Sequence, residues 1–106
     1  MAEENKQVIS KTDRKDDNVV YIGSKPFMNY VTSVVVQFSS KNKKEVIIKA
    51  RGKFITRAVD VAEVARKRFL EKDNIRVGAV KIDSEVFENQ DKRMVNVSTI
   101  EIVLVK

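Results

Sequence analysis

EVIIKARGKFITRAVDVAEVARKRFL, residues 45–70, is the stretch that decides the fold. Residues 45–50 form a short apolar run typical of a central strand, and Gly52 ends that run. From Thr56 onward the apolar residues repeat at three and four positions, with charged residues on the opposite side, which predicts a helix. The apolar repeat runs through Val59, Ala62, Ala65 and Phe69.

A second strand and helix precede this stretch. Residues 19–22 form a short β-branched and aromatic run closed by Gly23, which is typical of a buried strand. Residues 24–26, Ser-Lys-Pro, follow; serine can cap a helix and proline is tolerated in its first turn, so the predicted helix starts here. The valines of residues 27–38 favour a strand, but the apolar side chains lie at helical spacing, and the prediction is a helix.

The last part of the chain predicts a long hairpin. Residues 77–87 and 94–105 are β-rich runs joined by the polar turn 88–93. The apolar parity changes between Val97 and Ile100, which indicates either a bulge or a strand buried on both faces at its far end. The predicted order is β-α-β-α-β-β, an α+β domain.

Charge is unevenly distributed along the chain of 106 residues, which has the length of one domain. Residues 1–17 are rich in charge and poor in apolar side chains, so a disordered tail is expected there. The net charge is +6, and residues 18–106 hold seventeen basic and ten acidic side chains. A positive folded domain attracts polyanions, and nucleic acid is the first partner to consider.

Two absences narrow the chemistry. The chain has no Cys and no His, which removes thiolate nucleophiles, imidazole bases and the usual zinc sites, so no cofactor or metal is expected. Neither a signal-like segment nor an apolar run near the roughly 20 residues that cross a bilayer is present, so a cytoplasmic location and no membrane partner are expected.

One enzymatic alternative is a magnesium-dependent phosphoryl transfer that uses carboxylates. The candidate ligands are Asp60, Glu63, Asp83 and Glu85. Asp60 and Glu63 have basic neighbours at helical spacing, so ordinary ion pairs explain them better, and the prediction is a protein that is not an enzyme.

Basic side chains form four clusters. They are Lys25; Lys49, Arg51 and Lys53 around Gly52, with Arg57 one helical turn later; Arg66, Lys67 and Arg68; and Lys92 and Arg93 at the hairpin turn. With right-handed crossovers, both strand-to-helix loops open at the same edge of a sheet, so the first two clusters should converge. A hairpin with a basic tip has the dimensions to lie along a nucleic-acid groove.

An ordinary solvated surface is the alternative explanation for each cluster, and the third stabilises a helix carboxyl end. Core packing equally explains the aromatic residues considered for base stacking. These are Phe27, Tyr30, Phe38, Phe54, Phe69 and Phe87. Contact with phosphates is therefore expected rather than stacking on bases.

Three segments carry a resemblance: VVYIGSKPFMNYV (19–31), IIKARGK (47–53) with AVD (58–60), and VSTIEI (97–102). They resemble the Alba family of archaeal chromatin proteins, and the likeness spans nearly all of residues 18–106. The resemblance implies a mixed four-stranded sheet with two helices on one face, similar to the carboxyl-terminal domain of bacterial translation initiation factor three.

The resemblance also implies a function. Members form homodimers that bind double-stranded DNA, and RNA, through phosphates with little sequence preference and compact the chromosome. Lys25, Arg51 and Lys53 match the family's binding positions, and Arg68 and Phe69 match a contact between dimers along DNA. Ser24 stands where the family commonly has a lysine whose acetylation weakens binding, so the chain departs from the family pattern at that switch. A specialised RNA-binding factor and a selective DNA-binding regulator are the alternatives.

Overall fold

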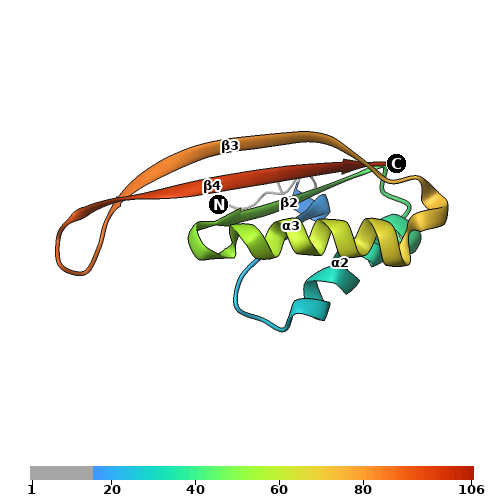
Figure 1. The fold of residues 1–106 in the computed structure, drawn as a ribbon, viewed down its shortest axis with the longest axis horizontal. Coiled ribbons are helices and arrows are strands. Elements are labelled where there is room, and N and C mark those ends of the chain that lie inside the picture. Colours follow the sequence, from blue (N-terminus) through green and yellow to red (C-terminus); the bar gives the residue numbers. More distant parts are fainter. Residues whose placement is uncertain (1–15) are drawn as a thin grey trace, which may run out of the picture.

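Two helices lie on one side of a four-stranded sheet in the computed structural model, which describes residues 16–106 (Figure 1). The elements are β1 (Val19–Tyr21), α2 (Phe27–Ser39), β2 (Glu45–Arg51), α3 (Ile55–Val64), β3 (Arg76–Glu88) and β4 (Met94–Val105). The predicted α+β fold and its β-α-β-α-β-β order are confirmed. The tail predicted at residues 1–17 falls, apart from its last two residues, outside the described part of the chain.

The sheet is mixed, with the strand order β1-β2-β4-β3. β1 and β2 pair in parallel because α2 carries the chain back between them, whereas β4 pairs antiparallel with both β2 and β3. β1 and β3 are therefore the two edges of the sheet. The carboxyl ends of β1 and β2 lie at the same end of the sheet, which places the loops that follow them side by side.

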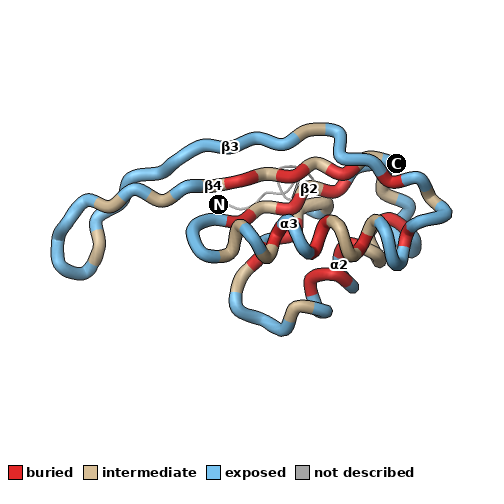
Figure 2. Tube along the Cα trace, in the orientation of Figure 1, coloured by how far each residue is buried: buried red, intermediate tan, exposed pale blue. Residues whose placement is uncertain are grey.

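The core lies between the helices and one face of the sheet (Figure 2). Alternate residues of the two central strands face the helices, namely Val46, Ile48 and Ala50 of β2 and Ile100, Ile102 and Leu104 of β4. The helices contribute Tyr30, Val31, Val34 and Phe38 from α2, and Ala58, Val61 and Ala62 from α3. The opposite face of the sheet carries no helix in the described part of the chain, and we call it the open face.

Helix α2 begins later than predicted. Pro26 occupies the cap position in an extended conformation, and no side chain caps the helix, so Ser24 lies too far ahead to cap it. The valine-rich sequence is helical all the same, because Val31, Val34 and Phe38 are buried against the sheet. Burial of one helix face outweighs the β propensity of the valines.

Helix α3 departs from its predicted apolar stripe at two positions. Ala58, Ala62 and Ala65 are buried, but Val59 and Phe69 are exposed. After Val64 the helix widens into a π-helical turn, Ala65–Phe69, closed by a bond of 3.0 Å from the Leu70 amide to the Ala65 carbonyl. The wider turn rotates Phe69 away from the core and lets Leu70 enter it.

The hairpin of β3 and β4 matches its prediction to within one residue at each end. The predicted bulge is wrong for β4: the register irregularity lies in β3, between Val77 and Ala79. The parity change in β4 has another cause. Ile100 lies over the helices, whereas Val97 belongs to the part of the strand that extends past them. At its far end β4 is buried on the helix side and half-buried on the other.

Candidate nucleic-acid interface

Lys25 and the basic residues after β2 lie at the same end of the sheet, and one side chain connects their two loops by hydrogen bonds. Arg57, at the start of α3, donates hydrogen bonds from Nη1 to the Lys25 carbonyl at 2.5 Å and to the Gly23 carbonyl at 3.3 Å. The loop after β1 is therefore held against the amino end of α3. We call Lys25, Arg51, Lys53 and Arg57 together the basic edge.

The loop after β1 is shaped by Tyr30 of α2. Its ring is buried, and its hydroxyl accepts hydrogen bonds from the Gly23 amide at 3.0 Å and the Lys25 amide at 2.9 Å. The phenol thus fixes this loop from within the core, and the Lys25 side chain remains exposed. Sequence reasoning assigned Tyr30 to packing alone; the available signal was that a buried tyrosine hydroxyl usually finds a partner.

The loop after β2 turns sharply at Gly52, whose φ of 59° is left-handed and suits glycine. A short 3-10 turn, Gly52–Phe54, leads from there into α3. The Lys53 ammonium lies 5.4 Å from the centre of the Phe54 ring, and Arg51 is paired with Glu85 of β3 at 2.6 Å. Both cations are exposed, and each is held near a fixed partner.

Lys49 lies two residues before Arg51 in β2, on the open face. Its ammonium is 3.6 Å from a Glu101 carboxylate oxygen and 5.8 Å from the centre of the Tyr21 ring. Lys49 is thus adjacent to the basic edge, with a half-buried side chain.

The hairpin tip projects from the end of the sheet at which the basic edge lies (Figure 1). β2 ends at Arg51 opposite Thr99, so residues 84–88 and 94–98 pair only with each other, and we call them the arm. In the turn, Asn89 Oδ1 accepts hydrogen bonds from the amides of Asp91 and Arg93, both at 2.9 Å. Lys92 and Arg93 are exposed at the end of the arm and do not join the basic edge.

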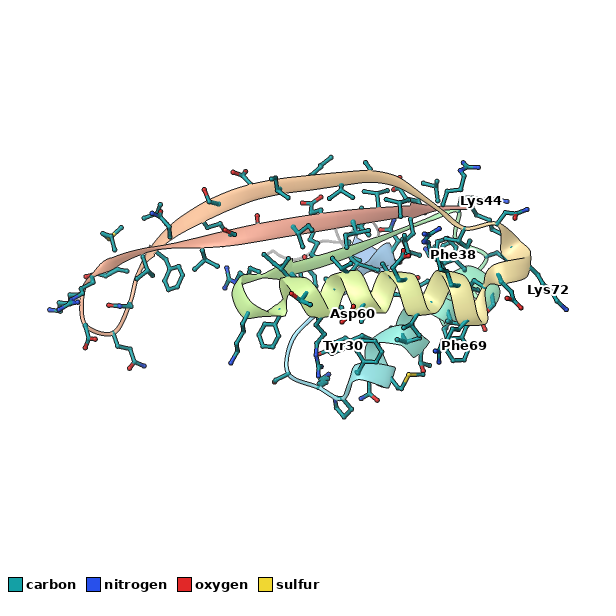
Figure 3. The ribbon with its side chains drawn as sticks, viewed as in Figure 1. Tyr30, Phe38, Lys44, Asp60, Phe69 and Lys72 are labelled. Atoms are coloured by element: carbon teal, nitrogen blue, oxygen red, sulfur yellow. The ribbon has the colours of Figure 1, made fainter. Side chains whose placement is uncertain are left out.

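Arg68 and Phe69 lie in the π-helical turn that follows α3. Figure 3 shows Phe69 at this end of the helix, away from the start of α3 and the basic edge. Phe69 is 52% exposed, so the core interpretation of this residue is wrong. Arg66 and Lys67 of the same cluster both pair with Glu63, at 2.9 and 3.2 Å.

The hydrogen bond from Arg66 is the main cause of a lowered pKa of Glu63; burial opposes it, and the hydrogen bond from Lys67 lowers the pKa further. Asp60 and Glu63 belong to α3, whereas Asp83 and Glu85 are on the open face, opposite the helices. The carboxylates proposed as magnesium ligands therefore do not converge. Residues 16–106 contain no group of three acidic side chains arranged to hold a metal.

No helix formed by residues 16–106 combines the length and apolar character needed to cross a bilayer.

Comparison with known proteins gives consistent matches. The Alba family model matches residues 18–84. The DNA/RNA-binding protein Alba of Methanothrix thermoacetophila is 55% identical over 91 residues, which are 86% of this chain and 98% of that protein. Its namesake in Methanococcus maripaludis is 48% identical over 90 residues, 85% of this chain and 99% of that protein. The solved structure of Alba from Thermoplasma volcanium superposes with a TM-score of 0.76 at 43% identity, covering 84% of this chain and all of that one. The chain belongs to the Alba family.

Proposed function

We propose that this protein binds double-stranded DNA, and RNA, through the phosphates held on its basic edge, with little sequence preference. The observation that carries the proposal is the Arg57 side chain, which bonds to the Gly23 and Lys25 carbonyls and so holds the loop after β1 against the start of α3, the helix that follows Lys53. Two relatives that cover nearly the same residues are named DNA/RNA-binding proteins. Nothing in this mechanism requires a catalytic step.

The expected mechanism is electrostatic. Residues 18–106 have a surplus of seven positive charges, and Lys25 and Lys53 are exposed where two loops meet. Phosphates that bind there release condensed counterions, a gain that does not depend on base sequence. Lys92 and Arg93, at the end of the arm, extend the contact toward a neighbouring groove.

A homodimer is part of the proposal, supported by the outer edge of the sheet. β3 is an edge strand, and five of its large apolar side chains are exposed: Val77, Val80, Ile82, Val86 and Phe87. Ile82 is 79% exposed, and unpaired apolar edges of this kind invite a partner. A second copy pairing on the same surface would double the basic edges along one duplex.

Chromosome compaction in the cytoplasm completes the proposal. Arg68 and the exposed Phe69 ring lie at the end of α3 away from the basic edge, where they remain accessible when nucleic acid is bound. Contact between dimers through this end would coat DNA side by side. A footprint on random DNA at rising protein concentration would then show cooperative, sequence-blind protection; protection of one short site would instead indicate a selective regulator.

The decisive experiment changes Lys25, Arg51 and Lys53 to Ala together and measures duplex affinity at several salt concentrations. The slope of log affinity against log salt should fall by about 0.9 for each lost phosphate contact. The control changes Lys41, Lys43 and Lys44 to Ala, which removes the same charge from the loop at the opposite end of β2. Equal losses in the two variants would contradict a localised interface, and competition by matched RNA and DNA duplexes shows which is preferred.

The dimer has its own experiment. Ile82→Glu places a charge on the exposed apolar edge and should yield monomers in sedimentation, whereas Lys81→Glu, on the open face of the same strand, should leave the dimer intact. A dimer that survives Ile82→Glu unchanged would place the contact elsewhere.

A further inference from the structure

The open face of the sheet carries an exposed aromatic ring beside the basic edge. Tyr21 of β1, Lys49 of β2 and Glu101 of β4 are register partners, so they form one row across that face. Arg51 and Thr99 form the next row, toward the arm. Tyr21 is 63% exposed, although tyrosine rings usually bury most of their surface.

These rows surround a shallow hollow of about 570 Å³. Its polar and aromatic side chains are Tyr21, Lys49, Arg51, Glu85, Thr99 and Glu101. The volume lies within the range of sites for ligands of nucleotide size. The hollow also reaches β3 at Glu85, but its charged side chains lie on the open face. Ile82 of β3 pairs with Ile100 on the helix side, so the hollow is distinct from the exposed apolar surface that the dimer would use.

The side chains in the hollow suit a nucleobase. An exposed ring on an open sheet, flanked by cations, is how several sheet domains hold unpaired bases. The Lys49 ammonium is 3.6 Å from Glu101, longer than a charge-assisted hydrogen bond, so it can exchange this partner for a phosphate without losing a strong contact. Thr99 and Glu101 supply a hydroxyl and a carboxylate for polar groups on the edge of a base.

We propose that Tyr21 stacks on an unpaired base of a strand whose phosphate lies on Arg51. Arg51 belongs to both the basic edge and the hollow, so a strand leaving a duplex can pass from one to the other. The bases of an intact duplex are already stacked and cannot reach the ring, so the site takes single-stranded ends, gaps or loops that adjoin duplex. This inference rests on the proposed nucleic-acid binding and adds a class of substrate to it.

The experiment compares the full chain and two variants on a blunt duplex and on the same duplex with a single-stranded overhang that contains 2-aminopurine. Tyr21→Leu keeps an apolar side chain but removes the ring, and Tyr21→Phe keeps the ring. Tyr21→Leu should weaken overhang binding by about fivefold or more, the usual contribution of one stacked base. Its affinity for the blunt duplex should stay that of the wild type, and Tyr21→Phe should match the wild type on both.

The 2-aminopurine signal provides an independent measurement. Stacking on the ring should quench emission at one position of the overhang in the wild type and in Tyr21→Phe, and the quenching should disappear in Tyr21→Leu. Equal effects of Tyr21→Leu on both substrates, or no effect on either, would overturn the inference. A change in sedimentation caused by Tyr21→Leu would instead assign the hollow to a second copy and also overturn it. Failure of the wild type to bind blunt duplex would contradict the proposed function, a result separate from these.

Discussion

The body of the molecule and its arm use the same two strands for different purposes. Under the helices, β4 buries Ile100, Ile102 and Leu104, and its environment is a packed core. In the arm, residues 84–88 are all exposed, and residues 94–98 are exposed or half-buried (Figure 2). Packing therefore restricts side chains in the body, while pairing between strands and charge restrict those in the arm.

The largest expected effect separates the two regions by stability. Phe38 is fully buried beneath the sheet, so Phe38→Ala should lower the free energy of unfolding by about 3–5 kcal/mol, through lost burial and an unfilled cavity. Phe87, in the arm, is only half-covered, and Phe87→Ala should cost less than about 1 kcal/mol. Urea unfolding measures both. Similar costs at the two positions would mean that the arm is covered in solution.

The next effect concerns the side chain that joins the two loops of the basic edge. Arg57→Ala removes two hydrogen bonds to loop carbonyls and should cost about 1–3 kcal/mol in urea unfolding, the usual range for bonds to a charged group. Duplex binding should also weaken, because the loop that carries Lys25 is no longer held against the start of α3.

Arg57→Lys is the matched control, because it keeps the charge but not the planar fork that reaches both carbonyls. It should retain the salt dependence better than Arg57→Ala while losing part of the stability. If Arg57→Ala weakens duplex binding no more than the loss of one phosphate contact would, the hydrogen bonds from Arg57 to the loop after β1 do not contribute to binding.

Much of the fold could be predicted from the sequence because its strongest patterns are local. The hairpin follows from two β-rich runs and one polar turn, and the valine-rich helix from its apolar spacing. The exposure of Phe69 could not be predicted, because it depends on a π-helical turn, and that of Val59 could not, because the face through Ala58, Val61 and Ala62 is spaced as well for packing. The π-helical turn leaves no mark in the apolar spacing.

The site was predictable to a smaller extent. The convergence of two loops follows from topology alone, and it correctly brings Lys25 near the start of α3. Two of the contacts that shape the loops were not predictable, since Arg57 and Glu85 each contact residues that lie more than 30 positions away in the chain. Tyr21 is the plainest case: an aromatic residue in a short strand has no sequence signal for which face it occupies.

A smaller effect lies where the body and the arm meet. The Glu85 carboxylate, at the base of the arm, pairs with Arg51 at the end of β2 and partly neutralises it. Glu85→Gln should therefore strengthen duplex binding and steepen its salt dependence. Stability should change by less than about 1 kcal/mol, because the pair is exposed. Glu45→Gln, at the other end of β2, is the charge-matched control. Equal gains from both would indicate a general charge effect rather than release of Arg51.

The smallest effect is a pH dependence of stability in the body, which arises from the ion pairs of Glu63. The pKa of Glu63 is lowered in the folded chain, chiefly by the hydrogen bond from Arg66. The folded state therefore binds a proton less readily than the unfolded state, so the contribution of Glu63 is present above its ordinary pKa and is lost as the pH falls through the folded value. The side chain is 40% exposed, so solvent screening keeps this contribution below about 1 kcal/mol.

Urea midpoints measured between about pH 3 and pH 7 would detect this contribution. Glu63→Gln should lower stability slightly at neutral pH and flatten the acid side of the profile. Glu88→Gln removes a carboxylate from the arm, where no described basic residue forms an ion pair with it, and should leave that profile closer to the wild type. If the two variants flatten the profile equally, the dependence belongs to the net charge of the chain. The ion pairs of Glu63 in the body would then contribute no more to the pH dependence of stability than an exposed carboxylate in the arm.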